Sequence, residues 1–187
     1  MVANLEATIE DLYAVPGKAE IVNGEIVHVS PTGAAPNYAA SEIFVSLRNY
    51  SRRMKTGYAV SDNAAFHVQL PKRKSFSPDA AYHIGEWTGM KFFEGSPMFA
   101  VEVRSEGDYG PAAEREMAAK RDDYFAAGTL VVWDVNLLSE DVIKSFGADK
   151  PGEPKVFRRG ELANAEPAVP GWSMNVDDLF IDESISN

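Results

Sequence analysis

Two short runs of apolar and polar residues near the start of the chain form its first regular pattern. The segment AEIVNGEIVHVSP contains β-type runs near 19–22 and 25–29, separated by Asn23-Gly24. This dipeptide accepts the positive φ angles that both central positions of a type I′ turn require. We therefore predict that the two runs pair as a β-hairpin.

A helical spacing follows. From Pro36 to about Lys55 the apolar residues recur three or four positions apart, and arginines stand between them. The apolar positions are Ala40, Ile43, Phe44, Leu47 and Met54. Gly57 follows the last of them, as is common after a helix C-terminus. The pattern predicts an amphipathic helix.

The middle of the chain alternates strand and helix signals. Residues 58–70 have strand composition, and SPDAAYHI and SPMFAVEVRS give two more strand candidates, joined by a loop over about 85–96. The segment GPAAEREMAAKRDDYFAAG carries proline near its start and glycine at its end, which is typical of a helix. TLVVWDV then has the continuous apolar run of a strand buried on both faces.

Strand, helix and buried strand in this order predict a βαβ unit. Strands 98–104 and 129–135 should lie parallel, with a right-handed crossover. Residues 141–147 and 154–158 suggest a peripheral hairpin, and the tail VPGWSMNVDDLF offers aromatic and aliphatic residues to pack back on the body. The predicted class is α/β, and the length predicts one domain over residues 1–187.

Composition narrows the class of protein. No tract approaches the roughly 18 apolar residues of a membrane helix, so we expect no membrane span. The first ten residues, MVANLEATIE, lack the basic start and apolar centre of a secretory signal, so we expect a cytoplasmic protein. The chain has no cysteine, which excludes disulfides and thiolate metal sites.

The formal net charge of -10 opposes long-range attraction to phosphate. A cluster of carboxylates that holds divalent cations would, however, add negative charge while preparing a site for phosphate chemistry. Charge alone therefore leaves nucleic-acid binding open.

Candidate chemistry begins at FAVEVRS, where Glu102 interrupts an apolar strand. Side chains two apart in a strand share a face, so Glu102 and Arg104 should be neighbours. A hairpin-like connection could set Asp79, at the start of the preceding strand, beside Glu102. Two buried carboxylates repel unless they share a cation or a proton, which favours Mg²⁺ or Mn²⁺ at this pair.

A lysine on the following predicted helix has the charge opposite to that of these two carboxylates. Lys120 lies at helical spacing from Ala113, Met117, Tyr124 and Ala127, on the apolar stripe that should face the sheet. A buried ammonium is costly unless it is paired, and Glu102 and Asp79 would pair it. There it could also hold an attacking water or a phosphate oxygen.

At PD in 78–79, EVR in 102–104 and the helical lysine of KRDDYFAAGTLVVWDV, the chain resembles the PD-(D/E)XK nuclease superfamily. The closest resemblance is to the Uma-type family of bacterial restriction endonucleases, and it extends from EIVNGEIVHVSP to YFAAGTLVVWDV. It implies a restriction-endonuclease-like core, a mixed central β-sheet flanked by helices, and hydrolysis of DNA. By the same resemblance Asp79 and Glu102 would bind the metal, and a lysine would assist.

The chain departs from the superfamily pattern at Arg104, where a lysine is expected. Arginine stays protonated, so it cannot act as a base, although it can stabilise phosphate charge. In the Uma-type relatives the cation comes from the next helix, which matches Lys120. The glutamate before the Asn-Gly turn, here Glu20, would be a further acidic member of the site.

Two functions stay open at this point. The first is a Mg²⁺- or Mn²⁺-dependent endonuclease acting on DNA, for which a homodimer is attractive because a duplex has two strands to cut. The second is a catalytically inactive binding or oligomeric scaffold in which Glu102, Lys120 and Arg104 form a buried ion network. For single residues a structural role also stays open: Asp79 as a turn residue, Lys120 as a snorkelling side chain, and Glu20 as a solvated hairpin residue.

Overall fold

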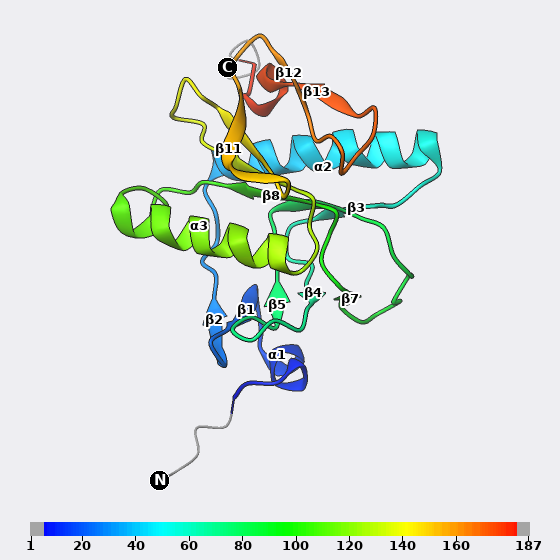
Figure 1. The fold of residues 1–187 in the computed structure, drawn as a ribbon, viewed down its shortest axis with the longest axis vertical. Coiled ribbons are helices and arrows are strands. Elements are labelled where there is room, and N and C mark those ends of the chain that lie inside the picture. The colour runs from blue at the N-terminus through cyan, green and yellow to red at the C-terminus, as the bar shows by residue number, and fades with distance from the viewer. Residues whose placement is uncertain (1–5, 183–187) are drawn as a thin grey trace.

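A mixed six-stranded sheet forms the centre of the molecule in the computed structural model, which describes residues 6–182 (Figure 1). Residues 1–5 and 183–187, the two ends of the predicted domain, lie outside the described residues. In spatial order the strands are β11 (Lys150–Phe157), β10 (Ile143–Gly147), β9 (Val131–Val135), β8 (Phe99–Val103), β6 (Ala80–His83) and β3 (Tyr58–Ser61). Strands β8 and β9 are parallel, and the other neighbours are antiparallel. The predicted α/β class is confirmed.

One long helix covers each face of the sheet (Figure 1). Helix α2 (Ala34–Met54) buries the predicted apolar stripe, including Ile43 and Leu47, against sheet residues such as Phe99. The helix ends at Lys55, which has the left-handed φ of 54. In the turn that follows, Gly57 has φ +57, and a Cβ there would lie 2.4 Å from the Tyr82 ring. The predicted amphipathic helix is confirmed, and the turn after it requires glycine.

Helix α3 (Pro111–Ala126) lies on the opposite face and joins β8 to β9. The parallel register pairs Glu102 with Asp134, so these side chains point to the same face of the sheet. Tyr124 of α3 is fully buried there with Ala100 and Val132. The predicted strand, helix and parallel strand are confirmed.

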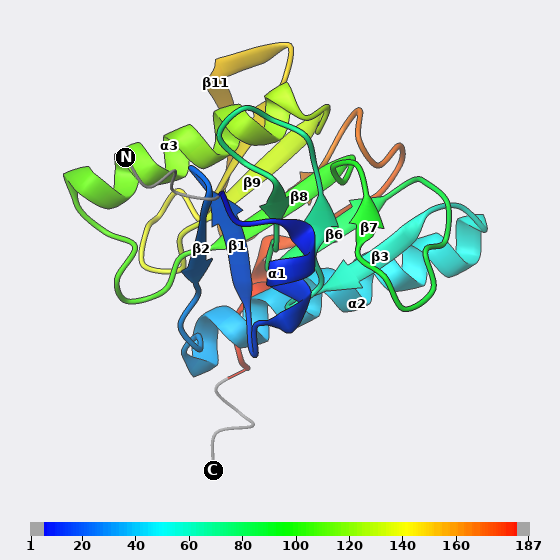
Figure 2. The same cartoon turned by 90° about the horizontal axis from the view of Figure 1, so that it is seen from below.

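The predicted hairpin is formed by β1 (Ala19–Val22) and β2 (Glu25–His28), with positive φ at both Asn23 and Gly24. Helix α1 (Ile9–Ala14) packs beside it. Seen from below, the hairpin lies in front of the sheet, between α3 and α2 (Figure 2). This placement lets β1 contribute side chains to the face that α3 covers.

Residues 58–70 do not form one continuous strand. Strand β3 ends at Ser61, and a turn with Asn63 at φ 67 separates it from β4 (Phe66–His67). Strand β4 then pairs in a small separate sheet with β5 (Ser75–Phe76) and β7 (Phe93–Glu94). A residue in the left-handed region cannot continue a strand, so the segment divides there.

The C-terminal region packs back on the α2 side, as predicted. It comprises β12 (Leu162–Asn164), β13 (Ser173–Asn175) and the 3-10 helix η1 (Val176–Leu179). Trp172 and Leu179 are buried in the same cluster as α2 and the sheet. Within residues 6–182, no helix is both long and apolar enough to cross a membrane.

Candidate active site

Strands β6 and β8 bring Asp79 and Glu102 together. Their antiparallel register pairs Ala80 with Val101, so the next positions along the ladder are Asp79 and Glu102. The Asp79 amide donates to the Val101 carbonyl at 3.0 Å, and its Oδ2 accepts from the Val103 amide at 2.8 Å. The predicted neighbourhood of the two carboxylates is confirmed, and Asp79 also fixes the end of β6 to β8.

Lys120 reaches the same place from helix α3. Its Nζ lies 2.8 Å from Glu102 Oε1 and 3.0 Å from Glu20 Oε1. One helical turn later, the Tyr124 hydroxyl donates to Glu102 Oε1 at 2.7 Å. The predicted orientation of Lys120 toward the sheet is confirmed, and strands β1 and β8 and helix α3 converge on this ammonium.

Glu20 is buried rather than a solvated hairpin residue, with only 5% of its surface exposed. Its Oε1 accepts from the Ser77 amide at 2.8 Å, and its Oε2 accepts from Arg73 Nη1 at 2.6 Å. Arg73 Nε donates in turn to Asp123 Oδ2 on α3 at 2.8 Å. Glu20 therefore ties the hairpin to the helix that carries Lys120.

A second lysine contacts Asp79 from the other side. Lys18 Nζ lies 2.8 Å from Asp79 Oδ1 and 2.6 Å from Asp62 Oδ1. Sequence reasoning missed both Lys18 and Arg73. The period-two rule could have found Lys18, which precedes Glu20 by two residues and shares its face. Arg73 stands in the basic turn PKRK, where nothing in the sequence marks it as buried.

Burial and charge act in opposite directions on the two glutamates. Burial raises the pKa of Glu102 to about 7, and the charges of Asp79 and Glu20 add to the rise, while Lys120 opposes it. Burial would also raise the pKa of Glu20, but Lys120 and Arg73 outweigh it and hold that pKa below its ordinary value. Of the two glutamates, Glu102 is therefore the one whose charged form is disfavoured.

The Lys120 ammonium stays protonated. Burial would lower its pKa, but the charges of Glu102 and Glu20 outweigh burial and raise it. About a fifth of each side chain of Lys120, Glu102 and Asp79 is exposed, so solvent and small molecules can reach them. The arrangement can therefore present a fixed positive charge beside two accessible carboxylates.

Arg104 does not join this cluster among the contacts of residues 6–182. Its Nε and Nη2 donate to the two oxygens of Asp134, each at 2.7 Å, and its other contacts include both oxygens of Glu114. It lies on the same side of the sheet as Glu102, as expected, but its guanidinium is bound to other acids. The structure therefore brings together Asp79, Glu102, Lys120 and Glu20, and leaves Arg104 apart.

Asp79 and Glu102 are the carboxylates best placed to hold a metal. In the part of the chain that the structure describes, no group of three or more His, Cys, Asp or Glu residues could do so. Mg²⁺ is commonly bound by one or two carboxylates, with water and substrate phosphate completing its shell. Two carboxylates on one side of the sheet suit that mode of binding.

Comparisons with known proteins identify the family and the fold. A family model described as "Putative restriction endonuclease" (Uma2) matches residues 9–177, a range that contains every predicted site residue. Among solved structures, "a putative nuclease belonging to DUF820 from Anabaena variabilis" has the same fold, with a TM-score of 0.71 and 16% sequence identity over 93% of this chain and 97% of that one. No curated protein matches the chain. Because the family model covers most of the sequence, the protein belongs to the Uma2 family.

Proposed function

We propose that the protein is an endonuclease that hydrolyses phosphodiester bonds in DNA with the help of Mg²⁺ or Mn²⁺. The observation that carries the proposal is the position of Lys120 Nζ, 2.8 Å from Glu102 and 3.0 Å from Glu20, on the sheet face where Asp79 adjoins Glu102. The family and the fold supply the reaction class, and this cluster supplies the residues.

The charge of the cluster supports a cation site. Five carboxylates connect through ion pairs to only three cationic side chains, so negative charge is in excess. The carboxylates are Glu20, Asp62, Asp79, Glu102 and Asp123, and the cations are Lys18, Arg73 and Lys120. Burial is the main cause of the raised pKa of Glu102, and the negative charges of Asp79 and Glu20 add to it. A bound divalent cation would polarise the scissile phosphate and lower the pKa of an attacking water.

The residues of the chain have distinct parts in this proposal. Asp79 and Glu102 would hold the cation. Lys120 would stabilise the negative charge that develops on the phosphate, because its raised pKa keeps it protonated and unsuited to act as a base. Glu20 would position Lys120, and Arg104 is left out because Asp134 and Glu114 already bind it.

Plasmid cleavage tests the assignment. The parent protein should cut DNA in Mg²⁺ or Mn²⁺ and not in excess EDTA, and Glu102→Ala should abolish the cutting. The matched control is Glu116→Ala, which removes an exposed glutamate of α3 and should cut as the parent does. Equal cutting by Glu102→Ala and the parent would overturn the proposal.

The scaffold alternative is favoured by one observation, the continuous chain of ion pairs from Lys120 through Glu20 and Arg73 to Asp123. A purely structural network would bind no Mn²⁺ in calorimetry, and replacing Glu102 and Lys120 together by apolar residues would cost little stability. A functional site predicts measurable Mn²⁺ binding that Asp79→Asn weakens. The two outcomes separate the alternatives without any cleavage assay.

Cutting both strands of a duplex would be served by a homodimer with two such sites. We expect the protein to sediment as a dimer, at least with DNA bound. A monomer that nicks single strands only would contradict this part of the proposal and leave the site assignment intact.

A further inference from the structure

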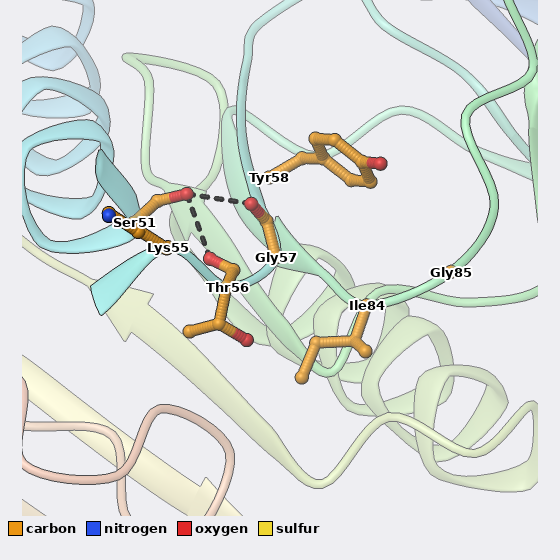
Figure 3. Close-up of a pocket in the computed structure, with 7 residues that line it drawn as sticks. All are labelled: Ser51, Lys55, Thr56, Gly57, Tyr58, Ile84 and Gly85. Atoms are coloured by element: carbon orange, nitrogen blue, oxygen red, sulfur yellow. Dashed lines mark hydrogen bonds between the residues drawn. The ribbon is translucent and has the colours of Figure 1, made fainter. Parts of the chain in front are cut away.

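The edge strand β3 borders two adjoining hollows, away from Lys120. One has a volume of about 280 Å³ and is lined by Lys55, Tyr58 and Ile84 among others (Figure 3). The other, of about 350 Å³, is lined by side chains that include Arg48, Arg52 and Trp87. Tyr58 belongs to both, so the hollows form one continuous surface along the sheet edge.

The charged residues that line this surface are all basic, in a protein whose net charge is -10. Between residues 43 and 61 the chain has four basic residues and no acidic one, and no residue that lines either hollow is acidic. Within residues 6–182, Arg48, Arg52 and Lys55 form no ion pair. Arg48 Nε is also buried without a hydrogen-bond partner. Unpaired cations gathered in this way suit anionic groups such as phosphates.

Aromatic rings stand among these cations. The rings of Tyr58 and Trp87 have centroids 5.4 Å apart, and Trp87 is 65% exposed. The other two tryptophans, Trp133 and Trp172, are buried. An exposed indole beside unpaired guanidinium groups is the combination on which single-stranded nucleic acid binds, with bases stacked on the rings and phosphates on the cations.

The surface leads toward the proposed catalytic residues. Ser61, which lines the second hollow, pairs in the ladder with Ala80, the residue after Asp79. The next residue, Asp62, contacts Lys18, which in turn binds Asp79. A strand of nucleotides lying along β3 would therefore come close to Asp79, at the margin of the proposed site.

We infer that the β3 edge binds unpaired nucleotides that flank the bond to be cut. The inference rests on the proposed function, and it adds a preference for single-stranded or locally opened substrate. A paired base in a duplex would present only its edge to Trp87, whereas an unpaired base can present its ring face.

Trp87 provides a direct measurement, because it is the single exposed tryptophan. Titration with a short oligothymidylate in EDTA, where no cleavage occurs, should quench the tryptophan emission of the parent, and Trp87→Phe should abolish the quenching. Trp87→Ala should weaken binding roughly tenfold, as expected for loss of one stacked base.

Two neighbouring arginines give a matched pair of variants. Arg52→Gln should weaken binding and lower the slope of log affinity against log salt by about 0.7, the value for one lost phosphate contact on a single strand. Arg53→Gln removes the same charge from the adjacent, exposed position, which lines neither hollow, and should bind as the parent does. Circular dichroism should show all of these surface variants folded.

Several results would overturn the inference: no quenching by the oligonucleotide, equal loss of affinity in the Arg52 and Arg53 variants, or tighter binding of blunt duplex than of single strand. Concentration-dependent dimerisation that Trp87→Ala abolishes would instead assign the surface to a second copy of the chain. Quenching without any plasmid cleavage would refute the proposed function alone. Cleavage and binding that are insensitive to Trp87 and Arg52 would refute this inference alone.

Discussion

Two ion clusters lie on the same face of the sheet, and each joins β8 to α3. One is centred on Glu102 and Lys120, and the other is centred on Arg104, only two residues further along the chain. Both contain more carboxylates than cations. They differ in how the surroundings shift the pKa of the group at the centre.

The contacts of the Arg104 cluster stabilise its charged groups. The hydrogen bonds that Arg104 donates to Asp134 and Glu114 raise the pKa of Arg104 and lower the pKa of Glu114. Arg104 also donates to the carbonyl of Asp108, in the loop before α3. Every shift favours the charged state, which is what a structural ion pair requires.

The Glu102 cluster has the opposite property. The pKa of its central carboxylate is raised to about 7, although Lys120 is only 2.8 Å away. A partly exposed carboxylate whose charged form is disfavoured would be stabilised by a further cation. Groups with perturbed pKa values of this kind concentrate at functional sites. The comparison supports our proposal that the Glu102 cluster carries out the chemistry, whereas the Arg104 cluster stabilises the fold.

The largest expected effect comes from a variant that disrupts the Arg104 cluster. Arg104→Met would leave Asp134, which is 5% exposed, as a buried charge without its partner. Loss of one partner of such a pair costs about 3–5 kcal/mol. Urea denaturation should show this loss, while DNA cleavage per folded molecule stays near that of the parent. A fully stable variant, or a folded one that cuts far more slowly, would reverse the roles of the two clusters.

Lys120→Met should do the reverse. Cleavage should fall roughly 10²–10³-fold, as when a preorganised stabiliser of transition-state charge is removed. Stability should fall by only about 1 kcal/mol, because Glu20 keeps Arg73 and Glu102 can take up a proton. The matched control is Arg115→Met, which removes an exposed cation of the same helix. Cleavage by Lys120→Met at the control's rate would remove Lys120 from the site.

The contrast between the clusters also shows which structural features local sequence rules can predict. The periods of strand and helix give the direction of a side chain, so Glu102 and Lys120 could be predicted to face each other. The Asn23-Gly24 turn, the apolar stripe of α2 and the order of strand, helix and strand are equally local, and each predicted element is present. Such signals fix which face a residue is on.

Partners brought from distant segments are beyond those rules. The strand period put Arg104 beside Glu102, but β8 ends at Val103, and the guanidinium then turns to Asp134 on β9 and Glu114 on α3. Arg73 meets Glu20 only because the PKRK turn packs beside β1, where Val22 bridges Arg73. Both outcomes depend on how separate elements pack, which no short window of sequence contains.

A smaller effect is the dependence of stability on pH, which tests the raised pKa of Glu102. Its folded pKa of about 7 lies above the ordinary value of 4.5, so the folded protein holds the proton between these values. Its contribution to stability is therefore full below pH 4.5 and is lost as pH rises through 7. Without divalent cations, the parent should lose about 3 kcal/mol over this window relative to Glu102→Gln. Parallel stability curves for the two proteins would show that Glu102 titrates normally.

The smallest effect concerns the hydroxyl that Tyr124 donates to Glu102 at 2.7 Å. Tyr124→Phe keeps the ring stacked on Phe76 and removes only this hydrogen bond, which should cost about 1 kcal/mol when Glu102 is charged. Because the lost donor stabilised the carboxylate, the pKa of Glu102 should rise further above 7.

Tyr82→Phe is the matched control for this last change. Its hydroxyl donates to the Thr56 carbonyl at 3.0 Å, on the α2 side of the sheet, so its loss should lower stability without moving the pH midpoint of Glu102. Stability curves over pH for the two variants therefore separate a hydrogen bond that tunes the carboxylate from one that only holds the fold. If both variants kept the parent's midpoint, Tyr124 would have no part in setting the charge of Glu102.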